Sequence, residues 1–237
     1  MSVIYPIGKY LGRFCIGTFG RLEVKGHDSV PPFGPLLLVC NHISYIDPPL
    51  LVATIGRRLN FIAKQELFAN PLYSFIFKQF GVYPLNRSGP AVDAVRLSLD
   101  LLSQDQALVV FPEGRRSSDH SLQQGLPGAA YIAMKSQAIL LPVGITGTEK
   151  IPLWRLPFPF VRLSVNIGQP FSLPVIEGTP SREVMKSLSD MIMGRIAALL
   201  PEKYRGIYGT AVAGAPEGVS ATLFPASVSK VPQEPGG

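Results

Sequence analysis

Apolar residues along this chain alternate between short continuous runs and longer stretches with helical spacing. The runs 36–40 and 107–111 are almost wholly apolar, which predicts strands that are buried on both faces of a sheet. The stretches 91–103 and 181–200 place apolar residues three or four positions apart, which predicts amphipathic helices. By the same signals we expect further strands at 21–25, 60–63, 82–85, 139–145 and 161–167, and further helices at 48–57, 68–80 and 128–136.

This alternation of strands and helices is typical of an α/β protein. It predicts a single-domain α/β sandwich with a mixed, mainly parallel sheet. With 237 residues, the chain is long enough for one core and short for two. We expect this domain to span 21–209. From Thr210 onward Ala, Gly, Pro, Ser and Val dominate without a period, so we expect 210–237 to be a disordered tail.

The segment 1–20 predicts an N-terminal amphipathic helix. Its apolar and aromatic residues recur at helical spacing, and Lys9 and Arg13 lie one turn apart. A broad apolar face with a basic stripe is typical of a helix that lies among lipid headgroups. We therefore predict that 1–20 is a membrane-interfacial helix, with an ordinary core helix as the alternative.

The composition favours a protein that meets a membrane in a reducing compartment. Hydrophobic residues make up 46% of the chain, yet no apolar run approaches the roughly 20 residues that would cross a bilayer. Two cysteines, Cys15 and Cys40, are too few for a disulfide framework. The net charge of +6 suits an anionic partner. The basic residues are scattered without a nucleic-acid-binding motif, so we expect a membrane surface, with a charge that serves only solubility as the alternative. The apolar loop 151–160, which contains Trp154, is a second candidate lipid contact.

Candidate chemistry begins directly after the buried run 36–40. His42 and Asp47 are five residues apart, so on one continuous helix they would point about 140° away from each other. The sequence supplies a bend, because Asp47 and the two prolines after it look like a capped helix start. A histidine beside a carboxylate is the usual general base at neutral pH. We therefore predict a catalytic pair, His42 and Asp47, at the carboxyl end of a strand.

A second polar block follows the apolar run 107–111. Glu113, Gly114 and two arginines stand at the end of that predicted strand, and Arg87 ends a third apolar segment. Arginine presents a planar fork that matches phosphate oxygens, so these residues favour an anion site. An ordinary turn with solvated arginines is the alternative.

In the order and spacing of these blocks, the chain resembles the glycerolipid acyltransferases, specifically the 1-acylglycerol-3-phosphate (lysophosphatidic acid) acyltransferases. The resemblance covers about residues 20–200. The motifs that carry it are Asn41-His42-x4-Asp47, Arg87 at the end of its segment, Phe111-Pro112-Glu113-Gly114-x-Arg116-Ser117, and Leu141-Pro142-Val143. Two positions depart from the family pattern: Arg115 stands where Thr is usual, and Leu126 stands where Lys is frequent.

The resemblance implies that 21–209 is an acyltransferase domain. His42 would take the proton from the free hydroxyl of a lysophospholipid, and Asp47 would orient His42. Arg87 and Arg116 would hold the acceptor phosphate, with Glu113 and Gly114 shaping that pocket. The co-substrate would be acyl-CoA or acyl carrier protein, and no metal or other cofactor is implied. The product would be phosphatidic acid, made by a peripheral protein on the cytoplasmic face of a membrane.

Three alternatives stay open at this point. A serine hydrolase could use Ser44 with His42, although the chain has no G-x-S-x-G elbow. A non-catalytic membrane-binding module could share the fold, although His42, Asp47 and the second polar block are all present. An acyltransferase could take a different lysolipid, a glycolipid or an amino-lipid as acceptor, which Arg115 and Leu126 leave open.

Overall fold

The computed structural model describes residues 4–86, 91–152, 155, 160–176 and 178–209. In these residues the strands form one seven-stranded sheet with the order β1-β7-β6-β2-β5-β3-β4. All neighbouring pairs are parallel except β6 and β7, which are antiparallel. The strands are β1 (Arg21–Lys25), β2 (Leu36–Cys40), β3 (Leu59–Lys64), β4 (Val82–Leu85), β5 (Ala107–Val110), β6 (Ile139–Thr146) and β7 (Arg162–Ile167).

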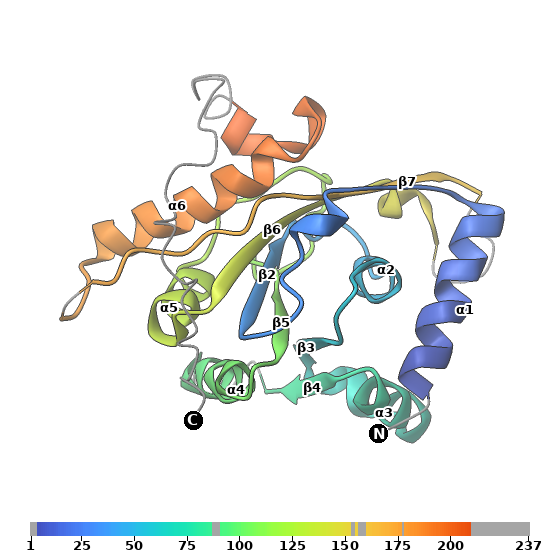
Figure 1. Ribbon diagram of the computed structural model, residues 1–237, viewed down its shortest axis with the longest axis horizontal. Coiled ribbons are helices and arrows are strands. Elements are labelled where there is room, and N and C mark those ends of the chain that lie inside the picture. Colours follow the sequence, from blue (N-terminus) through green and yellow to red (C-terminus); the bar gives the residue numbers. More distant parts are fainter. Residues whose placement is uncertain (1–3, 87–90, 153–154, 156–159, 177, 210–237) are drawn as a thin grey trace, which may run out of the picture.

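Helices cover both faces of this sheet (Figure 1). Helices α4, α5 and α6 lie on one face and α1, α2 and α3 on the other. Their bounds are α1 (Ile4–Phe19), α2 (Asp47–Thr54), α3 (Pro71–Gln79), α4 (Ala91–Ser103), α5 (Gly128–Ser136) and α6 (Arg182–Ala198). The predicted α/β fold with a mixed, mainly parallel sheet and an N-terminal helix is confirmed.

Strand β2 shows why the apolar runs are continuous. Leu37 and Val39 point into the core beneath α4, α5 and α6, whereas Leu36, Leu38 and Cys40 point into the core beneath α1 and α2. Both faces are covered, so every residue of the strand is buried. The edge strand β4 contains Pro84, which edge strands tolerate because the missing N–H faces no partner strand.

The predicted helix 68–80 is divided in the structure. A short 3₁₀ turn, η2 (Gln65–Phe68), precedes α3. The break has a local cause. Asn70 caps α3 by accepting the N–H groups of Leu72 and Tyr73 at 2.9 and 3.3 Å, and Pro71 fills the first helical position.

Helix α1 buries one side against α2 and the end of α3. Tyr5 and Ile16 are buried, and the Tyr5 hydroxyl accepts the N–H of Leu59 at 3.0 Å. Lys9 donates its ammonium to the carbonyl of Ile55 at 3.0 Å, just beyond the end of α2. Lys9 therefore lies in the contact between two helices, not on the outward side of α1.

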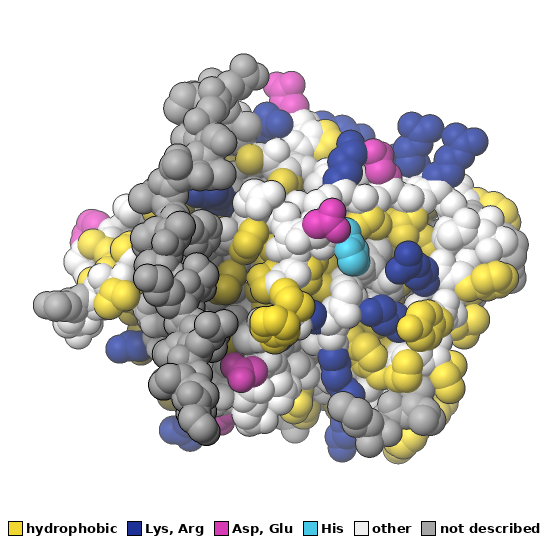
Figure 2. Space-filling model, viewed as in Figure 1, with side chains coloured by type: hydrophobic (Ala, Val, Ile, Leu, Met, Phe, Trp, Pro, Cys, Tyr) yellow, Lys and Arg dark blue, Asp and Glu magenta, His cyan; other side chains and the backbone are white. Residues whose placement is uncertain are grey.

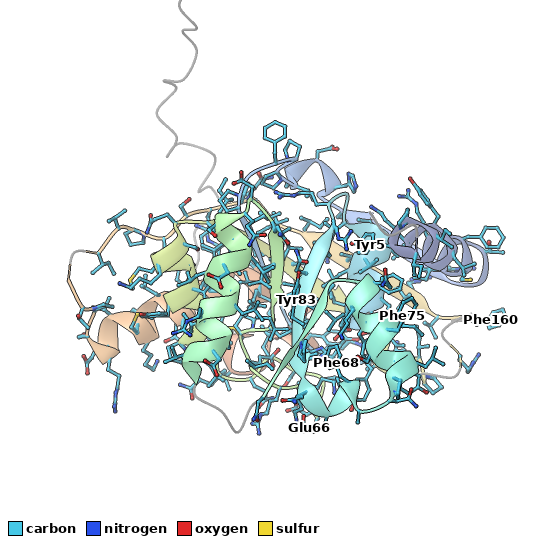
Figure 3. All side chains as sticks on the ribbon, turned by 90° about the horizontal axis from the view of Figure 1, so that it is seen from below. Tyr5, Glu66, Phe68, Phe75, Tyr83 and Phe160 are labelled. Carbon is cyan, nitrogen blue, oxygen red and sulfur yellow. The ribbon has the colours of Figure 1, made fainter. Side chains whose placement is uncertain are left out.

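The outward side of α1 is nevertheless apolar. Figure 2 shows hydrophobic side chains on the surface over α1 and over the neighbouring α3, and Figure 3 looks onto α3 from below. Among the described residues, no helix is long and apolar enough to cross a membrane. The Trp154 loop that we expected to touch lipid lies largely outside the described residues, as does the predicted tail 210–237.

The parallel strands place the candidate chemistry at one edge. The carboxyl ends of β2, β5 and β6 are neighbours. Each leads into a segment that carries polar residues: 41–47 after β2, 111–117 after β5 and 147–150 after β6. Segments more than 60 residues apart in the chain thus meet at this edge, as the direction of parallel strands requires.

Candidate active site

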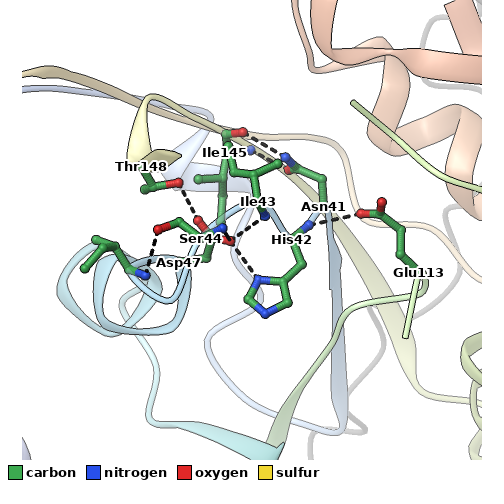
Figure 4. Close-up of polar contacts among 9 residues, drawn as sticks. Asn41, His42, Ile43, Ser44, Asp47, Glu113, Ile145 and Thr148 are labelled. Carbon is green, nitrogen blue, oxygen red and sulfur yellow. Dashed lines mark hydrogen bonds and ion pairs between the residues drawn. The ribbon is translucent and has the colours of Figure 1, made fainter. Parts of the chain in front are cut away.

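His42 and Asp47 meet at the carboxyl end of β2, as the sequence predicts (Figure 4). The Nδ1 atom of His42 lies 2.7 Å from Oδ2 of Asp47. The chain turns through residues 43–46 between them, and α2 then begins at Asp47. The turn supplies the bend that the five-residue spacing needs.

Asp47 does not cap α2 as expected. Its Oδ2 reaches back and accepts the N–H groups of Ile43 and Ser44, each at 2.8 Å. Its Oδ1 accepts the hydroxyl of Thr148 at 2.5 Å. Asp47 is fully buried. Four donors, His42 included, hold its carboxylate in one orientation.

The His42 ring is fixed on two sides. With Nδ1–H donated to Asp47, the lone pair lies on Nε2. The ring stacks on Phe111, with centroids 4.0 Å apart and an interplanar angle of 20°. The His42 side chain is 16% exposed, so a substrate hydroxyl can reach it. This is the arrangement of a general base that is oriented by a carboxylate.

Glu113 supports the backbone of His42. Its Oε1 accepts the His42 N–H at 3.1 Å, and its Oε2 accepts the Gln123 N–H at 3.0 Å. Burial raises the pKa of Glu113 to about 7, partly offset by these two hydrogen bonds, with the charges of Asp119 and Asp47 adding to the rise. Both carboxylate oxygens face backbone amides, so the geometry gives Glu113 a supporting contact to the loop of His42.

Gly114 makes the turn after Glu113 possible. Its φ is +68°, a conformation that favours glycine, and a Cβ there would lie 2.5 Å from Cδ1 of Leu126. The N–H of Leu126 donates to the carbonyl of Pro112 at 2.8 Å. Leu126, one of the two departures from the family pattern, therefore covers Gly114.

Arg116 stacks on Tyr45. The guanidinium carbon lies 3.6 Å from the centre of the Tyr45 ring, and both side chains are exposed. The next residue, Ser117, donates its N–H to the carbonyl of His42 at 2.8 Å, which attaches this segment to the His42–Asp47 turn. Arg116 thus lies beside the His42–Asp47 turn. Arg87, the other predicted phosphate ligand, lies outside the described residues.

Two other groups near the pair have structural roles. The hydroxyl of Ser44 accepts the N–H of Ile46 at 3.2 Å, and His42 Nδ1 faces Asp47. Cys40 is fully buried, and burial raises the pKa of its thiol well above the usual range. Within the part of the chain that the structure describes, no group of His, Cys, Asp and Glu is arranged to hold a metal ion.

Three residues at the site were given no role on the sequence alone, although Asn41 stands in the first motif. Thr148 bonds Asp47, Tyr45 carries Arg116, and Asn41 joins β2 to β6 by exchanging hydrogen bonds of 2.9 and 2.8 Å with the backbone of Ile145. Tyr45 had a usable signal, since it is an aromatic residue between His42 and Asp47. Thr148 had a weaker one, since it follows a glycine after a predicted strand.

Comparison with known sequences now decides the family. A profile described as Acyltransferase matches residues 21–146. The chain belongs to this family. The match covers more than half of the chain and includes the ends of β2, β5 and β6, where the polar residues above converge.

Relatives within the family carry a more specific name. The chain is 31% identical over 148 residues to the chloroplastic 1-acyl-sn-glycerol-3-phosphate acyltransferase LPAT1 of Arabidopsis thaliana, over 61% of this chain and 41% of the relative. It is 25% identical to the 1-acyl-sn-glycerol-3-phosphate acyltransferase of Bacillus subtilis, over 76% of this chain and 88% of the relative. The chain thus spans about two fifths of the chloroplastic relatives and most of the bacterial one.

A solved acyltransferase structure shares the fold. The 1-acyl-sn-glycerophosphate (LPA) acyltransferase PlsC of Thermotoga maritima superposes with a TM-score of 0.64 at 28% sequence identity. The superposition covers 80% of this chain and 76% of that chain. The family assignment and the α/β architecture therefore agree.

Proposed function

We propose that this protein transfers a fatty acyl group from a thioester donor to the free hydroxyl of 1-acylglycerol-3-phosphate, which gives phosphatidic acid. The observation that carries the proposal is the His42–Asp47 pair, bonded at 2.7 Å through Nδ1 with Nε2 left as the base. The names of the relatives in Arabidopsis and Bacillus support the choice of acceptor.

The reaction is a direct acyl transfer. Nε2 of His42 takes the proton of the acceptor hydroxyl as its oxygen attacks the thioester carbonyl carbon. A carbon–oxygen bond forms, the carbon–sulfur bond breaks, and the proton on His42 passes to the leaving thiolate. Asp47 holds the imidazole in the correct tautomer and stabilises the imidazolium between these steps. The donor is acyl-CoA or acyl carrier protein.

Acceptor binding rests on arginine. Arg116 lies beside the catalytic turn. Its guanidinium carbon lies over the Tyr45 ring, and we propose that the edge of this planar group binds phosphate oxygens. Arg87 is proposed as a second phosphate ligand. Glu113 and Gly114 shape the loop that carries Arg116, in keeping with Glu113 bonding the His42 backbone.

The proposed site of action is the cytoplasmic face of a membrane, with the protein bound peripherally. The acceptor and product carry acyl chains and remain in the bilayer. The outward apolar residues of α1 support this placement. Lys9 binds the carbonyl of Ile55 within the protein, whereas Arg13 is exposed and can contact anionic lipid.

The deciding experiment is an acyl-transfer assay with purified protein across a panel of lysolipids and both donor types. We expect 1-acylglycerol-3-phosphate to be the best acceptor and His42→Ala to remove turnover. A better rate with a glycolipid or amino-lipid acceptor would replace the proposed acceptor. Absence of transfer from every donor, with folded protein, would overturn the proposal.

A further inference from the structure

Helix α3 exposes an unusual amount of apolar surface. None of its residues is buried. Leu72, Tyr73, Phe75 and Ile76 are between 37% and 62% exposed, and all four lie within two turns. A helix that only served the core would turn its large apolar residues inward, so this arrangement calls for something that covers it.

Helix α1 adds a second apolar strip beside it. Ile7, Tyr10, Leu11 and Phe14 follow the i, i+3, i+4, i+7 spacing of one helix face and are between 60% and 69% exposed. The inward side of the same helix is already used by Tyr5 and Ile16. The outward strip is therefore separate from the contact with the protein core.

The two helices are joined at one point. Phe80, which ends α3, lies against Tyr5 of α1 with ring centroids 5.7 Å apart. The same Phe80 ring approaches α1 so closely that a Cβ on Gly8 would lie 2.2 Å from its Cζ. Figure 2 shows the apolar side chains over both helices, so we treat α1 and α3 as one apolar platform.

The charges on this apolar platform indicate what kind of partner binds it. Neither helix contains Asp or Glu, whereas Arg13 of α1 and Lys78 of α3 are exposed. A protein surface built from two helices with apolar outer residues, aromatic hydroxyls and only positive charges is complementary to an anionic bilayer. A water-facing surface would carry both signs of charge.

We propose that α3 is a second lipid-binding element, which enters an anionic bilayer together with the outward strip of α1. The inference rests on the proposed function only in that the acceptor lies in a bilayer. Two adjacent helices would fix the orientation of the protein, since one in-plane helix leaves rotation about its own axis free.

The experiment measures binding of the full chain to vesicles of phosphatidylglycerol and phosphatidylcholine by flotation. The test variant is Leu72→Ser with Phe75→Ser, because both side chains are exposed and their loss leaves the core intact. The matched control is Phe33→Ser with Ile207→Ser, which removes an aromatic and an aliphatic side chain that are 81% and 64% exposed away from both helices. A second variant, Lys78→Glu, tests the charge.

We expect the α3 variant to bind these vesicles at least about tenfold more weakly, since each lost side chain removes apolar surface from the contact with the bilayer. The control should bind like the wild type. Lys78→Glu should weaken binding to anionic vesicles and leave binding to pure phosphatidylcholine unchanged. Turnover of a short-chain, water-soluble acceptor should stay the same in all variants, which separates this proposal from the proposed function.

Two results would overturn the proposal. The first is the absence of an effect specific to α3: either the wild type and the α3 variant bind vesicles equally, or the control variant loses as much vesicle binding as the α3 variant. The second is a wild-type dimer that the α3 variant converts to a monomer in sedimentation velocity, with vesicle binding unchanged, which would show that a second copy covers the platform. Vesicle binding needs no acyl transfer, so either result stands whatever the acyl-transfer assay gives.

Discussion

Thr148 donates its hydroxyl to Asp47 at 2.5 Å, although the two residues are 101 positions apart in the sequence. Gly147 makes the contact possible. Its φ is +92°, and a Cβ there would lie 2.2 Å from the carbonyl oxygen of Arg162, so the turn after β6 is open to glycine alone. The turn aims Thr148 at the carboxylate that orients His42.

Replacing Thr148 by Val should lower kcat and stability together. Valine keeps the shape but removes the donor, which leaves a buried carboxylate oxygen without its partner at a cost of about 1–3 kcal/mol. Thr148→Ser should restore most of both, because it keeps the hydroxyl. Chemical denaturation and steady-state kinetics check this. A valine variant with normal kcat would show that Asp47 needs no support from β6.

His42→Ala and Asp47→Ala should each remove turnover while the protein stays folded. Loss of a general base costs on the order of 10² to 10⁴ in rate. The measurement is the single-turnover rate at matched concentrations of folded protein, with circular dichroism as the control for folding. Full activity in His42→Ala would disprove the general-base mechanism.

Glu113 should make stability fall as the pH rises. Its pKa is about 7 in the folded protein against an ordinary value of 4.5, so the folded state binds the proton more tightly than the unfolded state. The contribution is fully present below about pH 4.5 and is lost as the pH rises through about 7. The unfolding free energy of the wild type minus that of Glu113→Gln, which does not titrate, should therefore fall by a few kcal/mol at most as the pH rises through that window. A difference that is the same at pH 5 and pH 8 would contradict the raised pKa.

Arg116→Ala should raise KM for the acceptor by about tenfold or more and change KM for the donor little, because charge-assisted hydrogen bonds are worth about 1.5–3 kcal/mol. Arg116→Lys should rescue poorly, since lysine lacks the planar fork. Arg87→Ala should act in the same way. A rise in KM for the donor alone would show that these arginines bind the donor and not the acceptor phosphate.

The stacking of Arg116 on Tyr45 gives a finer prediction. Tyr45→Leu should raise KM for the acceptor by about two- to fivefold, since an exposed cation–π contact is worth about 0.5–1 kcal/mol. Tyr45→Phe keeps the ring and should behave like the wild type.

Arg115→Thr, which restores the usual family residue, should be tolerated, and a complete loss of activity would show that Arg115 has taken over a phosphate contact.

The strands, the helices and the contact between His42 and Asp47 could be predicted from the sequence because each depends on neighbours in the chain. A run such as Leu36–Cys40 is apolar throughout only if both faces of its strand are covered. The His42–Asp47 contact forms across the turn of residues 43–46, and the two prolines after Asp47 mark the helix start that requires this bend. Asp47 nevertheless turns back toward its own loop, where it accepts the N–H groups of Ile43 and Ser44, because Pro48 and Pro49 have no N–H to donate to it.

The supports of the site could not be predicted in this way. Thr148 reaches Asp47 only because β6 lies beside β2, and the order of strands in a sheet is not written in the pattern of any one strand. Glu113 bonds the backbone of His42 and Gln123, and a backbone amide leaves no signal in the side-chain sequence. The same holds for Lys9, whose partner is the carbonyl of Ile55.

The N-terminal helix shows what local sequence determines and what the packing of distant segments determines. Its sequence determined that it would be a helix with apolar residues around much of its circumference. Which of those residues would be buried was decided by the tertiary structure, because α2 and Phe80 occupy one side and leave Ile7, Leu11 and Phe14 outward. Local periodicity fixes how a segment folds, whereas the packing of distant segments fixes which of its faces remain available to a partner.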